Sequence, residues 1–523
     1  MPTHAQPLPT RREDLVAQLD PNTVYDIAIV GGGATGLGLA LDAALRGYRV
    51  VLVESDDFAK GTSSRSTKLV HGGVRYLAQG NIALVREALH ERSTLLHNAP
   101  HIAQPLPFVM PSYAWWEKPF YGFGLKMYDA LAGKSGLGST AFLSRQETVT
   151  CLPSVQVNGL RGGVKYWDGQ FNDTKLALAL ARSAALKGAL LLNYMRATRL
   201  LYTNEKISGL HCEDALTGQA HEIHARCVVN ATGVWVDGLR QMALNSPASA
   251  PAYKPLVTPS QGVHLVVKRE LLPIREAVLI PHTDDGRVLF AVPWLGATVI
   301  GTTDTPRTNA PLEPRPLDEE LAFLFAQTEH SLGLRLARSD VQSVWVGLRS
   351  LVGQAQGATS QMSREHLIRR EAPGLFTVTG GKWTTYRSMA AQVMQALVGH
   401  NDLPPAAHGP AQTAQHMLVG APDAGHAVHA ISEAPGLHLW GSEAAQVLAL
   451  PGAQHDLGMG LTEAMVRFAA RNEWALTVED MLARRWRALF LDARQAARMA
   501  PAVAALLQAE TGLDPQLDAF LAL

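Results

Sequence analysis

The chain has few cysteines, no long apolar run and no excess charge of either sign. Its 523 residues include three cysteines, Cys151, Cys212 and Cys227, with no CxxC pair among them. This argues against a disulfide framework or a cysteine-ligated metal site and favours a reducing compartment. No stretch approaches the roughly 18 uncharged apolar residues that a membrane-spanning helix needs. The 46 basic and 46 acidic residues balance, so net charge gives no argument for a nucleic-acid partner.

Other absences concern the N-terminal segment and metal-binding residues. Residues 1–20 contain no apolar core of the kind found in signal peptides, so we expect a short polar tail there. The sequence shows no metal-ligand spacing, and we expect no metal site. The chain does contain 47% hydrophobic and 18% charged residues. This is the composition of a globular protein with enough core for two or three domains.

A complete dinucleotide-binding unit lies between residues 24 and 54. VYDIAIV predicts a buried parallel strand, GGGATGLG the turn after it, LGLALDAALRG a helix and YRVVLVE a second strand. Gly31, Gly33 and Gly36 have the GxGxxG spacing, which permits the turn, the approach of a pyrophosphate and the packing of the helix on the strand. Glu54 ends the second strand, where a carboxylate accepts hydrogen bonds from a ribose. The unit predicts nucleotide binding at the helix N-terminus, without distinguishing NAD from FAD.

The segment that follows this unit favours a flavin. Residues 61–77, GTSSRSTKLVHGGVRYL, are small, hydroxylated, glycine-rich and basic, and they contain no long apolar run. Their hydroxyl groups can bind phosphates and lie against a flavin ring, and Gly72 and Gly73 permit close backbone approach. A polar surface loop is the alternative interpretation from composition alone.

Two later segments repeat the pattern of a strand that ends in a glycine turn. They are CVVNATG at residues 227–233 and FTVTGGKWTTYR at residues 376–387. The second turn places backbone N–H groups, Lys382 and Thr384 where the negative charge of a reduced flavin would lie. Three such segments in this order indicate one nucleotide domain assembled from separated stretches, with other material inserted between them.

Together these segments resemble the FAD-dependent glycerol-3-phosphate dehydrogenases of the respiratory type, within the glutathione-reductase/D-amino-acid-oxidase-like flavoproteins. The resemblance runs from about Tyr25 to the C-terminus, and KLVHGGVRYL is its most specific part. The chain departs from the family pattern at two places. Val234 follows the ATG glycine and Ser350 follows the GxR arginine, and the family usually has proline at both positions.

The fold that the resemblance implies is α/β + α: a Rossmann-like FAD domain, an inserted antiparallel-sheet substrate domain and a C-terminal helical domain. We expect the FAD-binding domain in residues 22–90, 155–235 and 345–398, the substrate or cap domain in 91–154 and 236–344, and the helical domain in 405–523. The short, closely spaced runs VHLVV, AVLI, RVLFAV and TVIGTTD favour an antiparallel sheet. The alanine-rich composition beyond about residue 405 favours helices.

The site residues follow from matching the family's motifs to this chain. Cofactor contacts are expected from Gly31, Gly33, Ala34, Thr35, Gly36, Glu54, Ser55, Thr62, Ser63, Ser64, Ser66, Lys68, His71, Gly72, Gly73, Ala197, Ala231, Thr232, Gly233, Gly381, Lys382 and Thr384. Catalytic or substrate-binding roles are expected for His264, Arg349, Lys382, Arg75 and Arg364. Thr302 and Asp304 of the GTTD segment are expected to order the pocket.

The implied chemistry needs a phosphate site and a base. Arg349 ends the strand-like run SVWVGLR and matches the family's substrate arginine, and a guanidinium can bond two phosphate oxygens at once. His264 lies in VHLVV, and an imidazole with a pKa near neutrality can accept the C2 hydroxyl proton while hydride leaves for flavin N5. A solvated arginine and a core histidine bonded to backbone are the alternative interpretations.

Two segments have the pattern of a membrane surface. Residues 113–128, YAWWEKPFYGFGLKMY, place aromatics among lysines, as an interfacial anchor does. Residues 481–498 interleave arginines with apolar side chains and predict a basic amphipathic helix, the pattern of a surface that faces anionic lipid. Its arginines are Arg484, Arg485, Arg487, Arg494 and Arg498. The alternatives are a packed lid over the active site for the first segment and a bundle helix with a solvated arginine face for the second.

The activity that the resemblance implies is oxidation of sn-glycerol 3-phosphate to dihydroxyacetone phosphate, with hydride transfer to FAD and electrons passed to a quinone. The implied partners are glycerol 3-phosphate, a quinone, an anionic membrane surface and, as an open alternative, a second copy of the chain in a homodimer. The implied location is cytoplasmic, at the inner face of the cytoplasmic membrane. The alternatives are a glycerol-3-phosphate oxidase that uses oxygen, an amine or amino-acid oxidase of the same fold, and a non-catalytic flavoprotein redox module.

Overall fold

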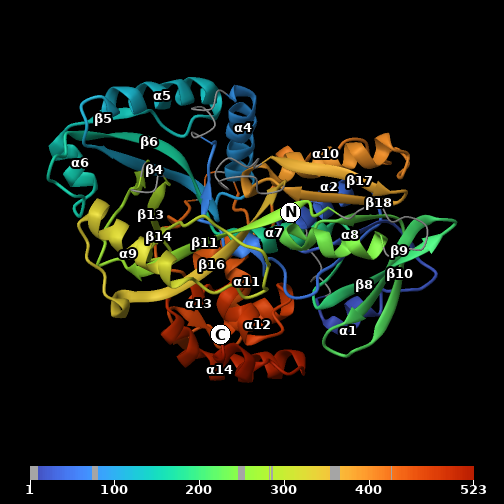
Figure 1. Ribbon diagram of the computed structural model, residues 1–523. Helices are drawn as coiled ribbons and strands as arrows, with labels where there is room; N and C mark the ends of the chain where they lie inside the picture. Colours follow the sequence, from blue (N-terminus) through green and yellow to red (C-terminus); the bar gives the residue numbers. More distant parts are fainter. Residues whose placement is uncertain are drawn as a thin grey trace.

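The computed structural model contains two large sheets and a C-terminal group of helices (Figure 1). It describes residues 10–73, 81–244, 254–281, 283, 287–353, 365–423, 425 and 427–523. The two sheets lie at opposite ends of the view in Figure 1, and the C-terminal helices lie below the region where the sheets meet. This is the fold expected from the sequence.

The first sheet is the nucleotide sheet, with eight strands and a parallel centre. Its strand order is β17-β18-β10-β1-β2-β7, with β9 paired to β10 and β8 to β9. The strands are β1 (Val24–Val30), β2 (Val50–Val53), β7 (Leu190–Leu192), β8 (Met195–Thr203), β9 (Lys206–Asp214), β10 (Ala220–Asn230), β17 (His366–Ala372) and β18 (Leu375–Gly380). Ile27 of β1 is fully buried and lies in register with Val50 on one side and Cys227 on the other. Because the central strands are buried on both faces, their sequences are continuous apolar runs.

Helices pack on this sheet, and the close packing depends on glycine. They are α1 (Arg12–Val16), α2 (Ala34–Leu45), α7 (Asp173–Leu186), α8 (Val236–Leu244) and α10 (Tyr386–Gly399), and α2 packs against both α7 and α10. A Cβ at Gly36 would lie 1.9 Å from the carbonyl oxygen of Gly31. Gly31 itself has φ of 112° and leaves no room for a Cβ beside Ala231. The expected turn between β1 and α2 therefore requires glycine at both positions.

The second sheet, the substrate sheet, has ten strands and is largely antiparallel. Its order is β15-β11-β14-β13-β12-β4-β6-β3, with β16 paired to β11 and β5 to β6. The strands are β3 (Leu69–Val70), β4 (Ala103–Ser112), β5 (Ala141–Leu143), β6 (Gly162–Phe171), β11 (Val257–Lys268), β12 (Ala277–Ile280), β13 (Leu289–Trp294), β14 (Ala297–Gly301), β15 (Thr305–Pro306) and β16 (Val341–Val352). Its helices are α4 (Ile82–Asn98), α5 (Glu117–Ala132), α6 (Arg145–Cys151) and α9 (Asp318–Leu332).

Each of the three segments expected in the FAD-binding domain also contributes a strand to the substrate sheet. We placed residues 155–235 and 345–398 wholly in the FAD-binding domain, but β6 pairs with β4 and β16 pairs with β11 in the substrate sheet. Strand β3, inside the expected 22–90 segment, also joins the substrate sheet through β6. The reason is that a strand's apolar pattern records its burial and does not identify the sheet that it joins.

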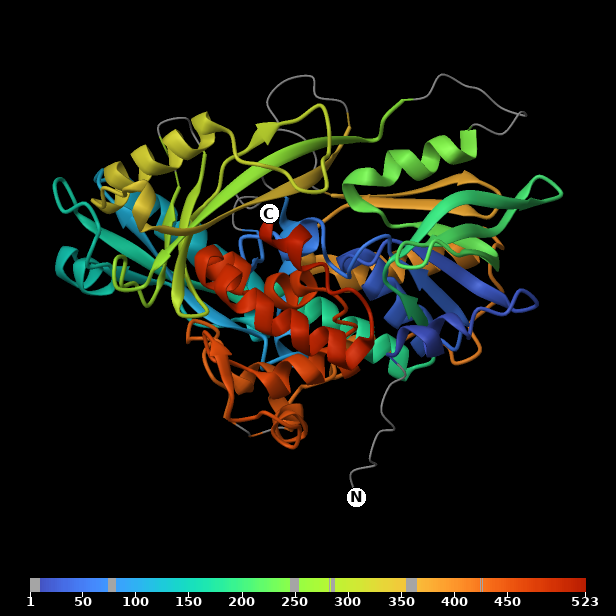
Figure 2. The ribbon, with the colours of Figure 1, turned by 90° about the horizontal axis from the view of Figure 1, so that it is seen from below.

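The C-terminal part is helical and covers the junction of the two sheets. Its elements are α11 (Ala444–Leu448), β19 (Asp456–Gly458), β20 (Leu461–Thr462), α12 (Glu463–Asn472), the turn η9 (Asp480–Arg485), α13 (Ala488–Leu491), α14 (Ala493–Thr511) and α15 (Leu517–Leu521). Figure 2 shows these helices lying across the molecule between the two sheets, and α13 packs against β11 and β16. In the part of the chain that the structure describes, no helix has the length and apolarity to cross a bilayer.

Candidate functional site

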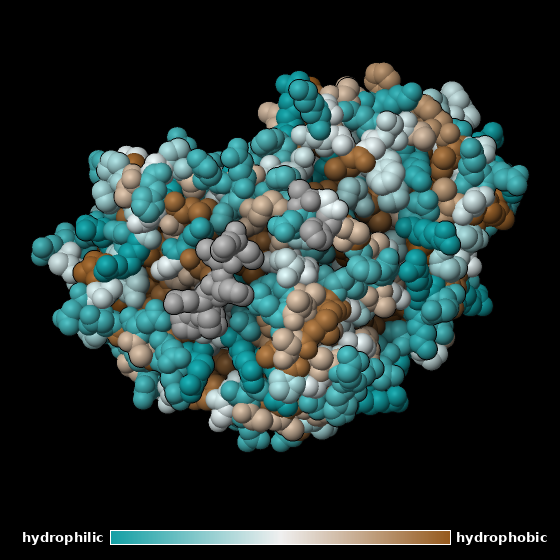
Figure 3. All heavy atoms as spheres, turned by 180° about the vertical axis from the view of Figure 1, so that it is seen from behind, coloured by the Kyte–Doolittle hydropathy of each residue, from teal (hydrophilic) through white to brown (hydrophobic). Residues whose placement is uncertain are grey.

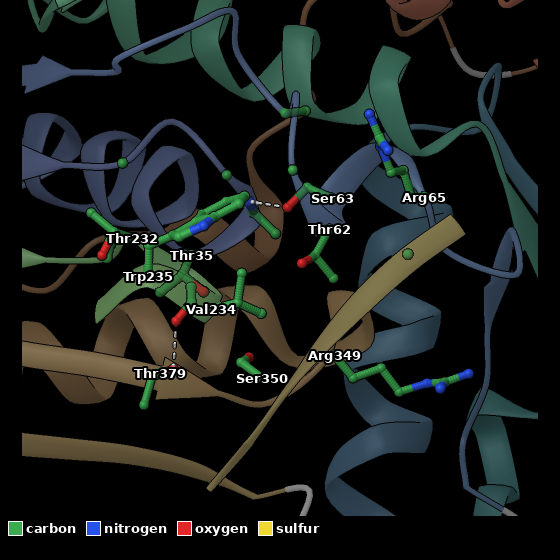
Figure 4. A pocket seen from close by; sticks show the side chains of 18 of the residues that line it. Thr35, Thr62, Ser63, Arg65, Thr232, Val234, Trp235, Arg349, Ser350 and Thr379 are labelled. Carbon is green, nitrogen blue, oxygen red and sulfur yellow. Dashed lines mark hydrogen bonds between the residues drawn. The ribbon is translucent and has the colours of Figure 1, made fainter. Parts of the chain in front are cut away.

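A cavity of about 630 Å³ is lined by residues of both sheets and brings the expected flavin segments together. Figure 4 shows Thr35, Ser63, Thr232 and Thr379 around this cavity, from four separated stretches of the chain. The expected site residues that line it are Gly31, Gly33, Ala34, Thr35, Glu54, Ser55, Thr62, Ser63, Ser66, His71, Ala197, Ala231, Thr232, Gly233, His264, Arg349, Gly381, Lys382 and Thr384. This size suits a large organic ligand.

Five expected cofactor residues lie outside this lining. Gly36 supports the packing of α2, as described above, and Ser64 and Lys68 are buried in the segment 61–71 but do not line the cavity. Gly72 donates its backbone N–H to Asp168 at 3.1 Å, and Gly73 has φ of 80° in the turn beside it. Two expected substrate residues, Arg75 and Arg364, fall outside the described residues.

The turn after β1 is fixed by side chains of the cofactor loop, residues 61–71. Ser63 lies in the turn η1 (Thr62–Ser64), and its hydroxyl accepts a hydrogen bond from the backbone N–H of Ala34 at 2.9 Å (Figure 4). Trp383, in the turn η6 (Trp383–Thr385), donates its indole N–H to the Ser63 carbonyl at 2.9 Å. A Cβ at Gly33 would lie 3.1 Å from the Ser63 hydroxyl. The N-terminus of α2 thus faces a cradle without side-chain bulk, and such a cradle fits a dinucleotide pyrophosphate.

Glu54 has the geometry of a ribose ligand. Its carboxylate lines the cavity at the end of β2 and accepts hydrogen bonds from the backbone N–H groups of Gly32 at 2.6 Å and Asp56 at 3.1 Å. Burial raises the pKa of Glu54, and these two N–H groups oppose the rise. A carboxylate held in this way presents its remaining lone pairs to hydroxyl donors in the cavity.

The other end of the cavity carries an ordered arginine. Arg349 extends from β16, and its guanidinium donates to Asp304 at 3.3 Å and to Thr302 at 3.2 Å. Its side chain is 26% exposed, so it is held by the protein and open to the cavity. Asp304 is in turn bonded to the Ser260 hydroxyl. The expectation that Thr302 and Asp304 order this region agrees with these contacts.

His264 lies beside the cofactor loop as a buried imidazole. Its Nε2 is 3.0 Å from the Thr67 hydroxyl, and its ring stacks on Trp345 with centroids 4.0 Å apart. Burial is the main cause that holds the pKa of His264 well below its ordinary value, followed by the charges of Lys68 and Arg349. The imidazole is therefore neutral near pH 7 and able to accept a proton, but its pKa lies below the value near neutrality that was expected of this base from the sequence.

Sequence reasoning missed several residues that line the cavity. Arg65, Trp235, Phe290 and Leu312 belong to this group. Trp235 donates its indole N–H to the Ala310 carbonyl at 2.8 Å, which holds the ring in place. Gly262 was also missed: a Cβ there would lie 2.5 Å from Arg349 Nη2. In the sequence, only the GTTD and GLR segments pointed to this region of the site. An isolated glycine in a strand, such as Gly262, has many structural explanations.

Three of the arginines expected to face lipid are buried instead. Arg484, Arg485 and Arg487 are at most 2% exposed. The Asp57 carboxylate receives hydrogen bonds from both Arg484 and Arg485. Burial alone would raise the pKa of Asp57, but these two guanidinium groups outweigh it and lower that pKa. The expectation of a lipid-facing basic helix at 481–498 is therefore wrong for Arg484, Arg485 and Arg487, because arginines matched to buried carboxylates have the same spacing as arginines on a solvated face. Arg494 and Arg498, on α14, are exposed.

The other expected surface segment does present aromatic side chains to the outside. Trp115, Phe120 and Phe123 are 76%, 64% and 74% exposed, on and just before α5. Figure 3 shows apolar side chains interspersed with polar ones at the upper end of the molecule, where α5 lies. Lys126 lies on the same helix, with its Nζ 5.2 Å from the ring of the exposed Phe142. We call this set, Trp115, Trp116, Phe120, Phe123, Met127 and Phe142, the aromatic surface.

Comparison with protein families places most of the chain in two family models. Residues 26–394 match the FAD-dependent oxidoreductase family. Residues 380–517 match the C-terminal domain of alpha-glycerophosphate oxidase. The first match covers the two sheets and the cavity, and the second covers the C-terminal helices.

Full-length relatives agree with these matches. The mitochondrial glycerol-3-phosphate dehydrogenase of Homo sapiens is 38% identical over 542 residues, covering 97% of this chain and 73% of the human protein. The mitochondrial glycerol-3-phosphate dehydrogenase SDP6 of Arabidopsis thaliana is 37% identical and covers 97% and 86%. A solved structure of the glycerol-3-phosphate dehydrogenase from Bacillus halodurans with FAD superposes with a TM-score of 0.77 at 29% identity, covering 98% of this chain and 96% of that one. The chain therefore belongs to the FAD-dependent glycerol-3-phosphate dehydrogenase family.

Proposed function

We propose that this protein oxidises sn-glycerol 3-phosphate to dihydroxyacetone phosphate and passes the electrons, through FAD, to a quinone in the membrane. The observation that carries the proposal is the shared cavity: a dinucleotide cradle at the N-terminus of α2 and an ordered arginine at Arg349 line the same space. A cradle alone would fit any flavoprotein. The combination with Arg349, Lys382 and Arg65 favours an anionic substrate.

The roles of the residues follow from the positions described above. FAD supplies the hydride-accepting centre. Arg349, held by Thr302 and Asp304, binds the substrate phosphate and orients C2. When the C2–H bond breaks and hydride leaves, the C2 hydroxyl loses its proton and a carbonyl forms. The neutral His264, with the Thr67 hydroxyl 3.0 Å from its Nε2, is the group that accepts this proton.

The proposed route to the quinone uses the aromatic surface on α5. Exposed tryptophan and phenylalanine side chains beside lysine are typical of helices that lie in a bilayer interface. Lys126 on α5 and Lys134, two residues after its end, are exposed and would attract anionic headgroups. We accordingly place the protein at the inner face of the cytoplasmic membrane, bound peripherally through this surface.

The proposal is tested by measuring the two half-reactions separately: reduction of the flavin by substrate and its reoxidation by an electron acceptor. Anaerobic mixing with glycerol 3-phosphate should bleach the flavin absorbance, whereas glycerol, glycine and proline should bleach it far more slowly. The reduced enzyme is then mixed with a soluble quinone analogue or with oxygen. Faster reoxidation by the quinone analogue is expected. Faster reoxidation by oxygen would indicate a glycerol-3-phosphate oxidase, bleaching by the amino acids an amino-acid oxidase, and no bleaching a non-catalytic flavoprotein.

A further inference from the structure

Two buried cations, Lys68 in the cofactor loop and Arg487 just before α13, pack against the loop without lining the cavity. The side chains of Lys68 and Arg487 are both 0% exposed. Lys68 donates to the Ser64 carbonyl at 2.8 Å, and Arg487 donates to the same carbonyl at 2.7 Å. Thr62 and Ser63, the residues just before Ser64, line the cavity. The two cations therefore hold the loop on which one wall of the cofactor site is built.

A single carboxylate faces both cations. Asp173, at the first position of α7, lies 2.6 Å from Lys68 Nζ and 3.6 Å from Arg487 Nη2. Within the described part of the chain, the ion pairs of these two cations involve Asp173 alone. Asp173 also accepts a hydrogen bond from the Ser66 hydroxyl at 2.8 Å. With both cations protonated, the cluster of Lys68, Arg487 and Asp173 thus carries one positive charge in excess.

Aromatic rings around Lys68 and Arg487 stabilise part of the positive charge that Asp173 leaves unbalanced. Lys68 Nζ lies 4.5 Å from the ring centroid of Trp345 and 5.2 Å from that of Trp294, and Arg487 Cζ lies 4.0 Å from that of Phe490. Cation–π contacts at such distances stabilise a buried charge. Even so, burial lowers the pKa of Lys68 to about 7 and that of Arg487 to about 10, against the opposing effect of Asp173. Arg487 therefore keeps its charge at pH 7, whereas Lys68 is close to half protonated there and becomes fully charged only at lower pH.

We infer that Lys68 and Arg487 are positioning residues whose excess positive charge stabilises the negative charge that bound FAD gains on reduction. A buried charge acts over a longer range than an exposed one, because solvent and salt screen it poorly. The cluster adjoins Ser66 and Thr67, which line the cavity. The inference rests on FAD binding and not on the identity of the substrate or of the electron acceptor.

The test is the midpoint reduction potential of bound FAD, measured at pH 6, where Lys68 is mostly protonated, by an anaerobic titration with dithionite and a reference dye. Lys68→Met and Arg487→Gln each remove one charge, and we expect both to shift the potential to a more negative value. Arg487→Lys keeps the charge and loses the planar contact with Ser64, so the potential should stay at the wild-type value even where FAD binds more weakly. The matched control is Lys175→Met. Lys175 is also buried and lies 3.8 Å from the Trp440 ring, but its Nζ donates to Glu473 at 3.0 Å and not to the Ser64 carbonyl of the cofactor loop.

The control should lose thermal stability and keep the wild-type potential. A wild-type potential in both Lys68→Met and Arg487→Gln would overturn the inference. An equal shift in Arg487→Lys and Arg487→Gln would also overturn it, because the effect would then come from the shape of the loop. If Lys68→Met does not retain FAD, the comparison of the two Arg487 variants decides alone. Dithionite reduces the flavin without substrate, so a failure of the proposed glycerol 3-phosphate activity would leave this test intact.

Discussion

Among single residues, Arg349 is held in place by hydrogen bonds and still reaches the cavity. Its guanidinium is bonded to Thr302 and Asp304, yet a quarter of the side chain remains exposed toward the cavity. The restraint means that little side-chain entropy is lost when a phosphate binds. The partner carboxylate of Asp304 keeps the cation from being isolated before substrate arrives.

Arg349→Ala should lower kcat/KM for glycerol 3-phosphate by roughly 10- to 150-fold, since a charge-assisted contact contributes about 1.5–3 kcal/mol. Steady-state kinetics with glycerol 3-phosphate and with glycerol, at equal flavin content, measure the effect. Gly262→Ala should act in the same direction, because its Cβ would lie 2.5 Å from Arg349 Nη2 and displace the guanidinium. An equal loss with both substrates would mean that Arg349 supports the fold and does not bind the phosphate.

His264 gives a pH prediction. An unfolded histidine has a pKa of about 6.5, and burial with the nearby charges of Lys68 and Arg349 lowers the pKa of His264 in the folded protein. The folded imidazole therefore stays neutral as the pH falls through about 6.5, where an unfolded one takes up a proton, and folding becomes less favourable at acid pH. Histidine-selective NMR, with His264→Asn to assign the signal, should show a neutral ring at pH 6 in the substrate-free protein. A signal that titrates at or above 6.5 would contradict this environment.

At the scale of elements, the cofactor site lies where the ends of four parallel strands meet one loop. Strands β2, β1, β10 and β18 are adjacent and parallel, so their carboxyl ends lie at the same edge of the nucleotide sheet. The loop containing Ser63 closes over that edge through Ala34 and Trp383. Segments far apart in sequence thus form one surface because the sheet order places them side by side.

Gly33→Leu should abolish FAD retention. Its backbone sits at the start of α2, facing the cradle, and a branched side chain would occupy the space of the pyrophosphate. The protein should purify without yellow colour, and the FAD content per chain, read from absorbance, measures the loss. Leu186→Ala, a change at the exposed end of α7, serves as the control and should keep full FAD content. Full occupancy in Gly33→Leu would show that the pyrophosphate binds elsewhere.

The double variant Phe120→Ser/Phe123→Ser should weaken binding to vesicles at least about tenfold, because burying one phenylalanine side chain stabilises by about 1.5–3 kcal/mol. Co-sedimentation with vesicles of anionic lipid measures the change, and flavin reduction by substrate should not alter. Tyr202→Ser removes an exposed aromatic from β8 and should leave vesicle binding unchanged. Equal binding by all three proteins would exclude the aromatic surface as the membrane contact.

For the whole molecule, the sequence predicted the parts that depend on local rules. The turn at Gly31 and the carboxylate at Glu54 could be placed because backbone sterics and ribose chemistry fix both residue types and their spacing. The roles of Arg485 and of strand β6 could not be placed. Periodicity does not distinguish a solvated arginine from one paired with a buried Asp57 some 428 positions away, nor does it name the partner of a strand. The packing of Lys68 could not be placed for the same reason, because Arg487, which donates to the same Ser64 carbonyl, belongs to the C-terminal part of the chain.

The contacts of Asp57 also bear on how the chain is made. Asp57 is synthesised early, whereas Arg484 and Arg485 follow more than 400 residues later. Until those arginines emerge, a carboxylate that ends fully buried lacks its charged partners, and burying it alone is costly. We therefore expect the nucleotide-binding half of a nascent chain to stay loosely ordered until the C-terminal part of the chain has been synthesised.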